Sequence, residues 1–325
     1  MMRAKGVAGS VLGPSHHGGR LIVRDEIAIA TTANRVATQV AVPTTAHPDA
    51  RTRRESLVVL FTTQTVQHNL QITTNVLSVD HAKFSKLSVF FPMWNEQDYL
   101  VRALDAAREE CEELIEQGDI ADYELIIVND ASTDRTGELA DAAAAADPRV
   151  RVVHHAQNRK LGGSMKSGYA AATGDLVLYT DADLPFDMHD VHKAVRLLRY
   201  YDADVVSAYR FDRTGEGYVR TVYSALYNML VRVLFGTRMR DINFAFKLCR
   251  TRIFEHIELK SEGSFIDAEL VVRAQKLGFT VVQFGVDYFP RTRGVSTLSS
   301  PAVIRKILKE ARTLRKEIRN ISPIQ

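Results

Sequence analysis

Short apolar runs alternate with longer stretches of helical period between residues 87 and 206. The runs are rich in Val, Ile, Leu and Phe and predict buried strands at 87–91, 124–128, 150–153, 176–179 and 205–206. The stretches between them predict helices at 99–117, 134–146, 163–172 and 188–200. Continuous apolar strands that alternate with helices are typical of an α/β fold. We therefore expect a Rossmann-like, mostly parallel sheet with helices on both faces.

Two later segments have the pattern of amphipathic helices. Residues 218–235 carry apolar side chains at helical spacing, are interrupted by Arg220 and Arg232, and precede Gly236, a common C-terminal cap. A last helix begins at Pro301 and places apolar residues on one side, namely Val303, Ile304, Ile307, Leu308, Ala311, Leu314 and Ile318. Because each segment keeps charged positions, both predict surface helices rather than membrane-spanning ones.

The first 83 residues differ from the rest of the chain. Phe61 is their only aromatic residue, and no helical or strand period is sustained through them. Such composition predicts a poorly ordered extension. We expect three parts: an extension at 1–83, a catalytic domain at 84–298 and a basic amphipathic helix at 299–325.

Composition excludes several classes of protein. The 325 residues are 46% hydrophobic and 25% charged, which is a globular profile. Two cysteines are too few for a disulfide framework, and no apolar run reaches the roughly 20 residues that span a bilayer. The first residues lack the apolar core of a signal peptide. A secreted, collagenous or integral membrane protein is therefore not expected.

The charge is unevenly distributed. A net charge of +3 is too small to indicate nucleic-acid binding. Residues 291–325, however, contain nine basic and two acidic residues. This segment alone carries more than the whole excess of positive charge.

Polar side chains gather where the predicted strands end. Asn95 and Glu96, then Asp130, then Asp181 and Asp183 each follow a strand. Ligands of parallel sheets bind beyond the carboxyl ends of the strands. The last two carboxylates are hard oxygen ligands on alternate residues, which suits Mg²⁺ or Mn²⁺ bound to a diphosphate.

The sequence does not match other common phosphate-binding and catalytic motifs. Residues 162–167 resemble a P-loop, but Met165 stands where glycine must precede the lysine. No G-x-G-x-x-G follows the first strand, and no G-x-S-x-G is present. The histidine pairs 154/155 and 189/192 lack a convincing third metal ligand, so we expect all four to be structural or surface residues.

Taken together, these motifs resemble those of family 2 glycosyltransferases of the GT-A fold. The matching segments are 91–96, 128–134, 158–159 with Gly162 and Gly168, 172–175, and 181–183. The second half resembles the polyprenyl-phosphate (dolichyl-phosphate mannose synthase) branch, at Arg220 and Ser224, 241–247, 265–270, and Arg291 with Gly294 and Ser296. The resemblance covers about 87–298 and leaves the extension unexplained.

The resemblance implies a role for each matching residue. Pro92, Glu96 and Asp130 would hold the base and ribose of a nucleotide-sugar donor, and Asp181 and Asp183 would hold the metal and diphosphate. Acceptor-side roles fall on three residues: Arg220 and Ser224 would contact the acceptor phosphate, and Arg291 would bind phosphate charge nearby. Lys160 and Arg210 complete the expected substrate-binding set. The expected catalytic residues are Asp183, Asp267 and Arg220.

The chain departs from the family pattern at three places, and the role of a fourth residue is open. Lys160 stands where the family often has glycine, residues 184–187 lack the glutamine common in the mannose branch, and Ala245 replaces a usual glycine. The first two leave the sugar donor open. Asp267 has two interpretations: a base or acceptor-positioning group, or a carboxylate that pairs with a nearby arginine or caps its helix.

The resemblance therefore predicts a metal-dependent inverting glycosyltransferase, a hexosyltransferase. Its donor would be a GDP- or UDP-sugar, its acceptor a polyprenyl phosphate, and its metal Mg²⁺ or Mn²⁺, with no nucleic-acid partner. We expect it in the cytoplasm, at the inner face of the membrane. Two alternatives remain: a family 2 enzyme with another acceptor, or a catalytically degenerate membrane-associated interaction protein. The two C-terminal helices have a plainer interpretation too, as packing elements only.

Overall fold

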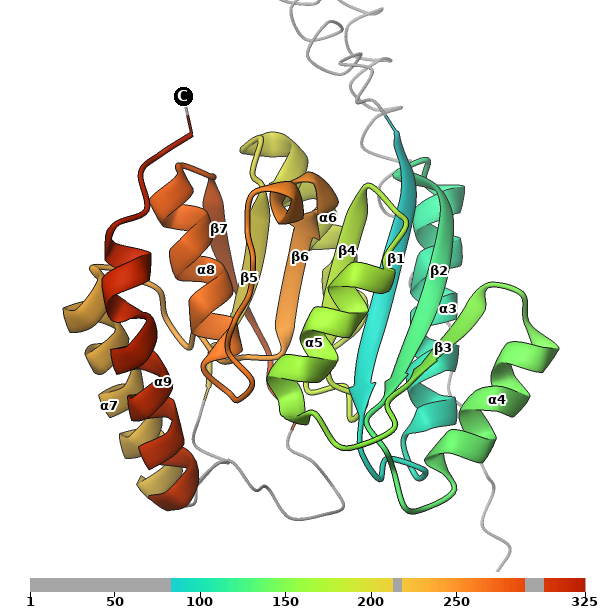
Figure 1. Cartoon of the computed structure of the whole chain (residues 1–325). Helices are drawn as coiled ribbons and strands as arrows, with labels where there is room; N and C mark the ends of the chain where they lie inside the picture. The colour runs from blue at the N-terminus through green and yellow to red at the C-terminus, as the bar shows by residue number, and fades with distance from the viewer. Residues whose placement is uncertain (1–82, 213–217, 290–300, 325) are drawn as a thin grey trace, which may run out of the picture. The chain divides into compact units, whose positions relative to one another are not determined.

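The computed structural model describes residues 83–212, 218–289 and 301–324, so the predicted extension at 1–83 lies almost wholly outside the described residues. The described part contains a seven-stranded sheet in the order β3-β2-β1-β4-β6-β5-β7 (Figure 1). The strands are β1 (Phe84–Met93), β2 (Ile120–Asn129), β3 (Val150–His154), β4 (Leu176–Thr180), β5 (Val205–Arg210), β6 (Phe246–Arg250) and β7 (Val281–Val286). All neighbouring strands are parallel except where β6 is involved.

Helices cover both faces of the sheet, as the sequence predicted. One face packs against α3 (Leu100–Glu116), α4 (Thr136–Ala146) and α6 (Asp190–Tyr200), and the other against α5 (Lys160–Ala171) and α8 (Ile266–Leu277). In α3 the apolar positions recur at three- and four-residue spacing and are all buried; they are Leu100, Ala103, Leu104, Ala107, Cys111 and Leu114. The helical period therefore aims one stripe of α3 at the sheet.

Two motif glycines let α5 approach its neighbours closely. A Cβ atom on Gly168 would lie 2.2 Å from the ring of Phe90 on β1. A Cβ atom on Gly162 would lie 2.4 Å from the carbonyl oxygen of Ser261. Both separations are shorter than van der Waals contact allows, so a larger residue would push α5 away from β1 at Gly168 and away from the loop at Ser261 at Gly162.

The antiparallel strand β6 determines where the second half of the chain meets the sheet. Thr180, the last residue of β4, pairs with Phe246, the first residue of β6. Since β6 begins where β4 ends, the segment before β6 lies at the carboxyl edge of the parallel strands. A short 3₁₀ helix, Thr251–Glu255, follows β6 at the opposite edge.

Two helices form a layer of their own beside α8. They are α7 (Tyr218–Phe235) and α9 (Pro301–Arg319), which lie side by side at one end of the sheet in Figure 1. Val231 and Phe235 of α7 pack with Ile307 and Ala311 of α9 and with Phe265 in a separate apolar cluster. Among the described helices, none is both long and apolar enough to cross a membrane.

Candidate functional site

The loops after β1 and β2 are joined by hydrogen bonds. The Asn95 side-chain oxygen accepts from Thr133 N at 2.8 Å, and Asn95 N donates to Ser132 Oγ at 3.0 Å. The backbone of Glu96 donates to Thr136 Oγ1 at 2.9 Å. The two predicted binding loops therefore form one rigid rim, with Pro92 at the end of β1 just behind it.

Asp130 is held firmly at the end of β2. It is 3% exposed, and its Oδ1 accepts from Arg159 N at 2.6 Å and lies 2.7 Å from His155 Nδ1. His155 Nε2 lies 2.8 Å from Ser167 Oγ on α5. His155 is thus a partner of the predicted binding residue, a role the sequence did not reveal. The only available signal was its position directly after β3.

The two carboxylates after β4 face a cavity of about 630 Å³. Asp181 and Asp183 are half-buried and both line it. Tyr179 Oη donates to Asp181 Oδ1 at 3.0 Å, and burial raises the pKa of this phenol well above its ordinary value. The phenol therefore stays protonated and fixes Asp181 from inside the sheet.

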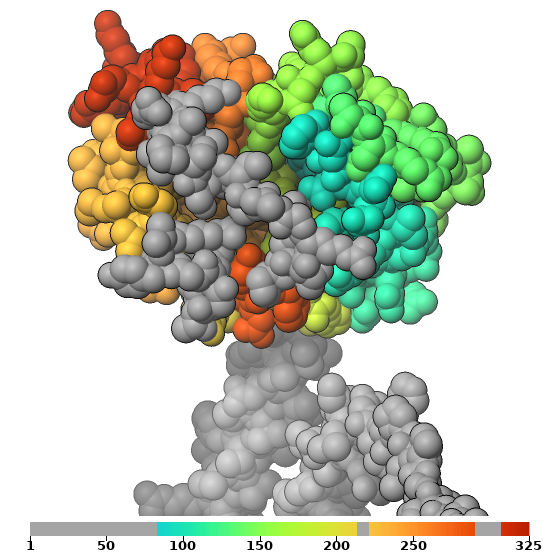
Figure 2. Space-filling view, turned by 90° about the horizontal axis from the view of Figure 1, so that it is seen from below, coloured from blue at the N-terminus to red at the C-terminus, as the bar shows by residue number. Residues whose placement is uncertain are grey.

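The opposite wall of the cavity is apolar. It is formed by side chains of α7 and α9, namely Tyr223, Leu226, Tyr227, Met229, Leu230, Val233, Ile307 and Leu308. Ser224, a predicted acceptor contact, lines the same cavity. In the view onto the carboxyl edge, α7 and α9 (amber and red) lie on one side, and β1 with the elements after it (cyan and green) lies on the other (Figure 2).

Arg210, at the end of β5, is held by an ion pair with Asp241 from the segment before β6. Its Nε and Nη2 donate to the two carboxylate oxygens of Asp241 at 2.6 and 2.7 Å, and both side chains are less than 10% exposed. The guanidinium also lies 5.0 Å from the centre of the Tyr288 ring. Arg210 lines the cavity, so its bidentate pair with Asp241 sets the position of one positive charge there.

Asp267 lies behind the cavity rather than on its wall. Its carboxylate is 1% exposed and 3.3 Å from Nζ of the fully buried Lys247, which donates to the Phe244 carbonyl. Burial raises the pKa of Asp267 despite this pair. Its neighbour Glu269 bonds Arg273 at 2.8 Å. Asp267 pairs with a lysine, therefore, and is not among the residues that line the cavity.

Residues with left-handed backbone conformation lie in the loops after the first four strands. Asn95, Ala131, Lys160 and Leu184 follow β1, β2, β3 and β4, and their φ angles are 59°, 55°, 64° and 50°. Lys160 is the position where the family often has glycine, and its φ gives the physical reason, because glycine adopts this conformation without strain. Non-glycine residues there store strain at the site.

Two predicted residues cannot be placed. Arg291 lies outside the described residues, and the Arg220 side chain does too, although its backbone lies in α7. Of the remaining predictions, the cavity brings together Asp181, Asp183, Arg210 and Ser224. Pro92, Glu96, Asp130 and Lys160 lie on the loops beside it at the same edge.

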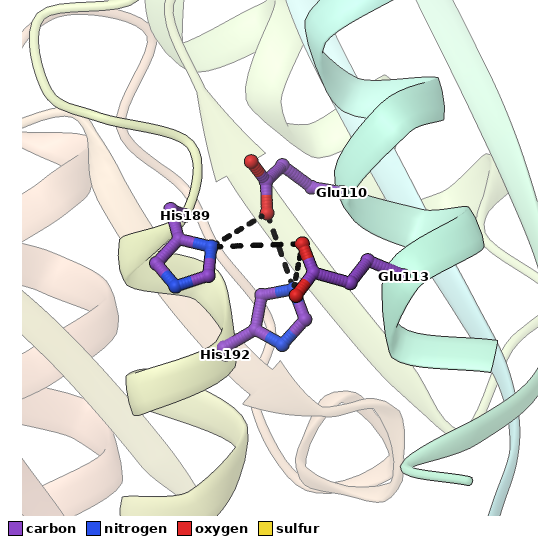
Figure 3. Close-up of side chains that lie close together, drawn as sticks. All are labelled: Glu110, Glu113, His189 and His192. Atoms are coloured by element: carbon purple, nitrogen blue, oxygen red, sulfur yellow. Dashed lines mark hydrogen bonds and ion pairs between the residues drawn. The ribbon is translucent and has the colours of Figure 1, made fainter. Parts of the chain in front are cut away.

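A second group of metal-binding residue types lies away from the cavity. Glu110, Glu113, His189 and His192 come together between α3 and α6 (Figure 3). The expectation that the 189/192 pair lacks further ligands is therefore wrong. The two glutamates lie 76 to 82 residues earlier in the chain, so sequence spacing gave no sign of them.

Comparison with known proteins identifies similar sequences. Residues 88–258 match the family model described as glycosyl transferase family 2. Glycosyltransferase AglD of Haloferax volcanii is 34% identical over 212 residues, 63% of this chain and 33% of that protein. The polyprenol monophosphomannose synthase of Mycolicibacterium smegmatis is 30% identical over 69% of this chain and 84% of its own length. An undecaprenyl-phosphate 4-deoxy-4-formamido-L-arabinose transferase of Yersinia pestis is 30% identical over 52% of this chain and 50% of its own length.

Solved structures support the fold. Glucosyl-3-phosphoglycerate synthase from Mycobacterium tuberculosis, in complex with Mn²⁺, UDP-glucose and phosphoglyceric acid, has a TM-score of 0.51 at 20% identity. The match covers 70% of this chain and 80% of that one. The predicted GT-A fold is thereby confirmed, and at this identity nothing beyond the fold follows. The chain spans about a third of AglD and half of the Yersinia transferase.

Proposed function

Because this chain belongs to glycosyl transferase family 2, we propose that it transfers a sugar from a nucleoside-diphosphate sugar to a polyprenyl phosphate. The observation that carries the proposal is the two-sided cavity, with Asp181, Asp183 and Arg210 on one wall and the apolar side chains of α7 and α9 on the other. A polyprenyl phosphate has the same division, since a charged phosphate adjoins a long hydrocarbon. The names of the relatives from Mycolicibacterium and Yersinia support this acceptor class.

The donor would bind across the loops after β1, β2 and β4. Pro92 and Glu96 would contact the base and ribose, with Asp130 presenting a carboxylate that His155 and Arg159 N already orient. Asp181 and Asp183 offer hard oxygen ligands at a strand end facing the cavity, a donor set that fits Mg²⁺ or Mn²⁺. When bound, such an ion would neutralise charge on the departing nucleoside diphosphate.

The acceptor would enter along α7 and α9. Ser224 lines the cavity, and Arg220 lies one helical turn before it, which suits a shared grip on one phosphate. An acceptor phosphate oxygen would attack the anomeric carbon and invert its configuration, and the sugar–diphosphate bond would break. The phosphate is already an anion at neutral pH, so it needs no general base. The interior pairing of Asp267 with Lys247 is compatible with that chemistry.

Peripheral membrane binding would bring the enzyme to its lipid. Leu226, Met229, Val233 and Leu308 are large apolar residues of α7 and α9 that are 42–74% exposed. Exposed basic residues follow on α9, namely Lys309, Arg312, Arg315, Lys316 and Arg319. Basic clusters gain about 1 kcal/mol per residue at an anionic leaflet, so we propose that these helices dock on the cytoplasmic face.

The proposal is tested by assaying transfer from a panel of GDP- and UDP-sugars to a polyprenyl phosphate in detergent. Asp183→Asn should lower turnover by about a hundredfold or more, the scale of losing a major electrostatic contact. Asp122→Asn is the matched control, because Asp122 is an exposed carboxylate near the start of β2, away from the carboxyl edge. Transfer to soluble acceptors but not to the lipid would overturn the acceptor assignment, and full activity of Asp183→Asn would remove the metal site.

A further inference from the structure

Four side chains converge between α3 and α6. Glu110 and Glu113 are three residues apart on α3, and His189 and His192 are three residues apart at the start of α6, so each pair shares one helix face. Figure 3 shows all four pointing toward one another. One ligand atom from each lies within 4.8 Å of all the others. None of the four lines the cavity described above.

The distances between these ligand atoms suit a small cation with tetrahedral coordination. His192 Nε2 and His189 Nδ1 lie 3.1 and 3.3 Å from Glu110 Oε2, and each lies 3.8 Å from Glu113 Oε2. Zinc takes nitrogen and oxygen ligands at about 2.0–2.2 Å, which places tetrahedral ligand atoms about 3.3–3.6 Å apart. Shifts of a few tenths of an ångström would bring these four atoms to that geometry.

His192 supplies a second, independent observation. It is 3% exposed, and its Nε2 makes no hydrogen bond within the described part of the chain. Its Nδ1 lies 3.3 Å from Gln117 Oε1, so Nε2 is the ring nitrogen that faces the glutamates. Nε2 is 3.1 Å from Glu110 Oε2 without forming a hydrogen bond to it. A cation bound to both atoms would satisfy this buried nitrogen.

The surroundings orient the carboxylates. Gln117 Nε2 donates to Glu113 Oε1 at 2.7 Å, which turns the other carboxylate oxygen toward the histidines. Arg196 in turn donates to Gln117 Oε1 at 3.0 Å. Outer contacts of this kind orient the ligands of metal sites.

We propose that Glu110, Glu113, His189 and His192 bind one divalent transition-metal ion, with zinc the favoured ion, which links α3 to α6. Two imidazoles and two carboxylates form a mixed nitrogen and oxygen set that suits zinc, whereas Mg²⁺ and Ca²⁺ prefer oxygen ligands alone. The site is separate from Asp181 and Asp183 in both position and ligand type. Because a linked pair of helices resists unfolding, the ion should stabilise the folded chain.

The experiment uses the full chain, stripped of metal by chelation and dialysis. Titration with Zn²⁺ is followed by calorimetry and by melting temperature, and titration with Co²⁺ by the visible absorption of the four-coordinate ion. The Asp181→Asn/Asp183→Asn double variant removes the other acidic pair. In that background we expect one equivalent of Zn²⁺ to bind, to raise the melting temperature and to remain bound in millimolar Mg²⁺.

Rim variants identify the ligands without disturbing the core. His189 and Glu113 have side chains 62% and 41% exposed, so His189→Ala and Glu113→Gln should fold normally. Each should weaken Zn²⁺ binding by more than about tenfold, since even outer contacts of metal ligands contribute about 10–100-fold. His154→Ala is the matched control, because His154 is also part-exposed and lies 2.9 Å from one carboxylate, that of Asp141. It should bind Zn²⁺ normally.

Three results would overturn the proposal. They are a folded, metal-free double variant that binds no Zn²⁺ at micromolar concentration, unchanged binding in both His189→Ala and Glu113→Gln, and displacement of the ion by Mg²⁺. None of these results measures sugar transfer, so the proposed zinc site and the proposed function are tested independently.

Discussion

The two walls of the cavity are built by different forces. The strand-end wall, defined by Asp181, Asp183 and Arg210 and adjoined by the loop that bears Asp130, is fixed by hydrogen bonds to buried partners such as Tyr179 and Asp241. The helical wall, defined by Leu226, Met229, Val233 and Leu308, rests on apolar packing between α7, α8 and α9. Hydrogen bonds fix the orientation of the polar groups in the strand-end wall, whereas apolar packing in the helical wall imposes no such orientation. Such a pair suits a substrate with one rigid charged end and one flexible apolar end.

The largest effect should come from the ion pair between Arg210 and Asp241, which positions Arg210 in the strand-end wall. Arg210→Ala leaves the Asp241 carboxylate buried without its bidentate partner, which typically destabilises a fold by about 3–5 kcal/mol. Urea unfolding monitored by circular dichroism measures the change. The exposed pair Arg135–Glu138 provides the comparison, since Arg135→Ala should change stability little. Equal losses for the two variants would mean that Arg210 does not fix the wall.

The next largest effect should come from the oriented carboxylate of Asp130, on the loop beside the strand-end wall. Asp130→Asn keeps the shape of the side chain and removes the charge, so nucleoside-diphosphate affinity should fall by roughly tenfold or more, the scale of a hydrogen bond to a charged group. Calorimetry with GDP and UDP measures it. Asp122→Asn should bind like the wild type. If Asp130→Asn binds as tightly, the base and ribose lie elsewhere.

A smaller effect should follow on the helical wall. Met229→Ser removes an apolar contact for the lipid, so the KM for a long polyprenyl phosphate should rise by about threefold to tenfold, in line with about 1 kcal/mol for part of an apolar side chain. Donor affinity should not change. Val101→Ser is the control, because Val101 and Met229 are both 56% exposed. A similar rise with a short-chain acceptor would show that Met229 does not contact the hydrocarbon.

The smallest effect concerns backbone strain in the strand-end loops. Lys160→Gly relieves a left-handed residue at a cost of about 1–2 kcal/mol, partly offset by the entropy of glycine, so the gain should be about 0.5 kcal/mol. Melting temperature measures it. Lys316→Gly, in the ordinary helical backbone of α9, should instead destabilise by about 1 kcal/mol. A loss of stability in both variants would contradict the strain at Lys160.

The same contrast explains what the sequence could predict. The helical period predicted the buried stripe of α3, and apolar runs predicted β1 to β5, because both patterns are local. Strands β6 and β7 were missed because their apolar runs are interrupted: β7 by Gln283 and Gly285, and β6 by Lys247, whose burial depends on its distant partner Asp267. Family resemblance predicted a family 2 glycosyltransferase, and the family match confirms it.

Within the site, the sequence identified single residues better than pairs. Asp181 and Asp183 follow a strand and were expected at its end, where they lie; their metal-binding role stays a prediction. The pairs Asp130–His155 and Arg210–Asp241 join residues 25 and 31 positions apart. No periodicity encodes such partners, because only the completed sheet brings them together. The group of Glu110, Glu113, His189 and His192 escaped prediction for the same reason.

The antiparallel strand β6 has a consequence for the order in which the molecule is assembled during synthesis. Because β6 lies between β4 and β5, these two strands cannot become part of one sheet until residue 250 has left the ribosome. Until then β4 presents an open edge, although the loops bearing Asp130 and Asp183 have already been made. Pairings over such sequence separations form slowly. The loops after β2 and β4 are synthesised before the α7 and α9 residues that complete the cavity. A nascent chain therefore has no complete cavity in which to bind substrate.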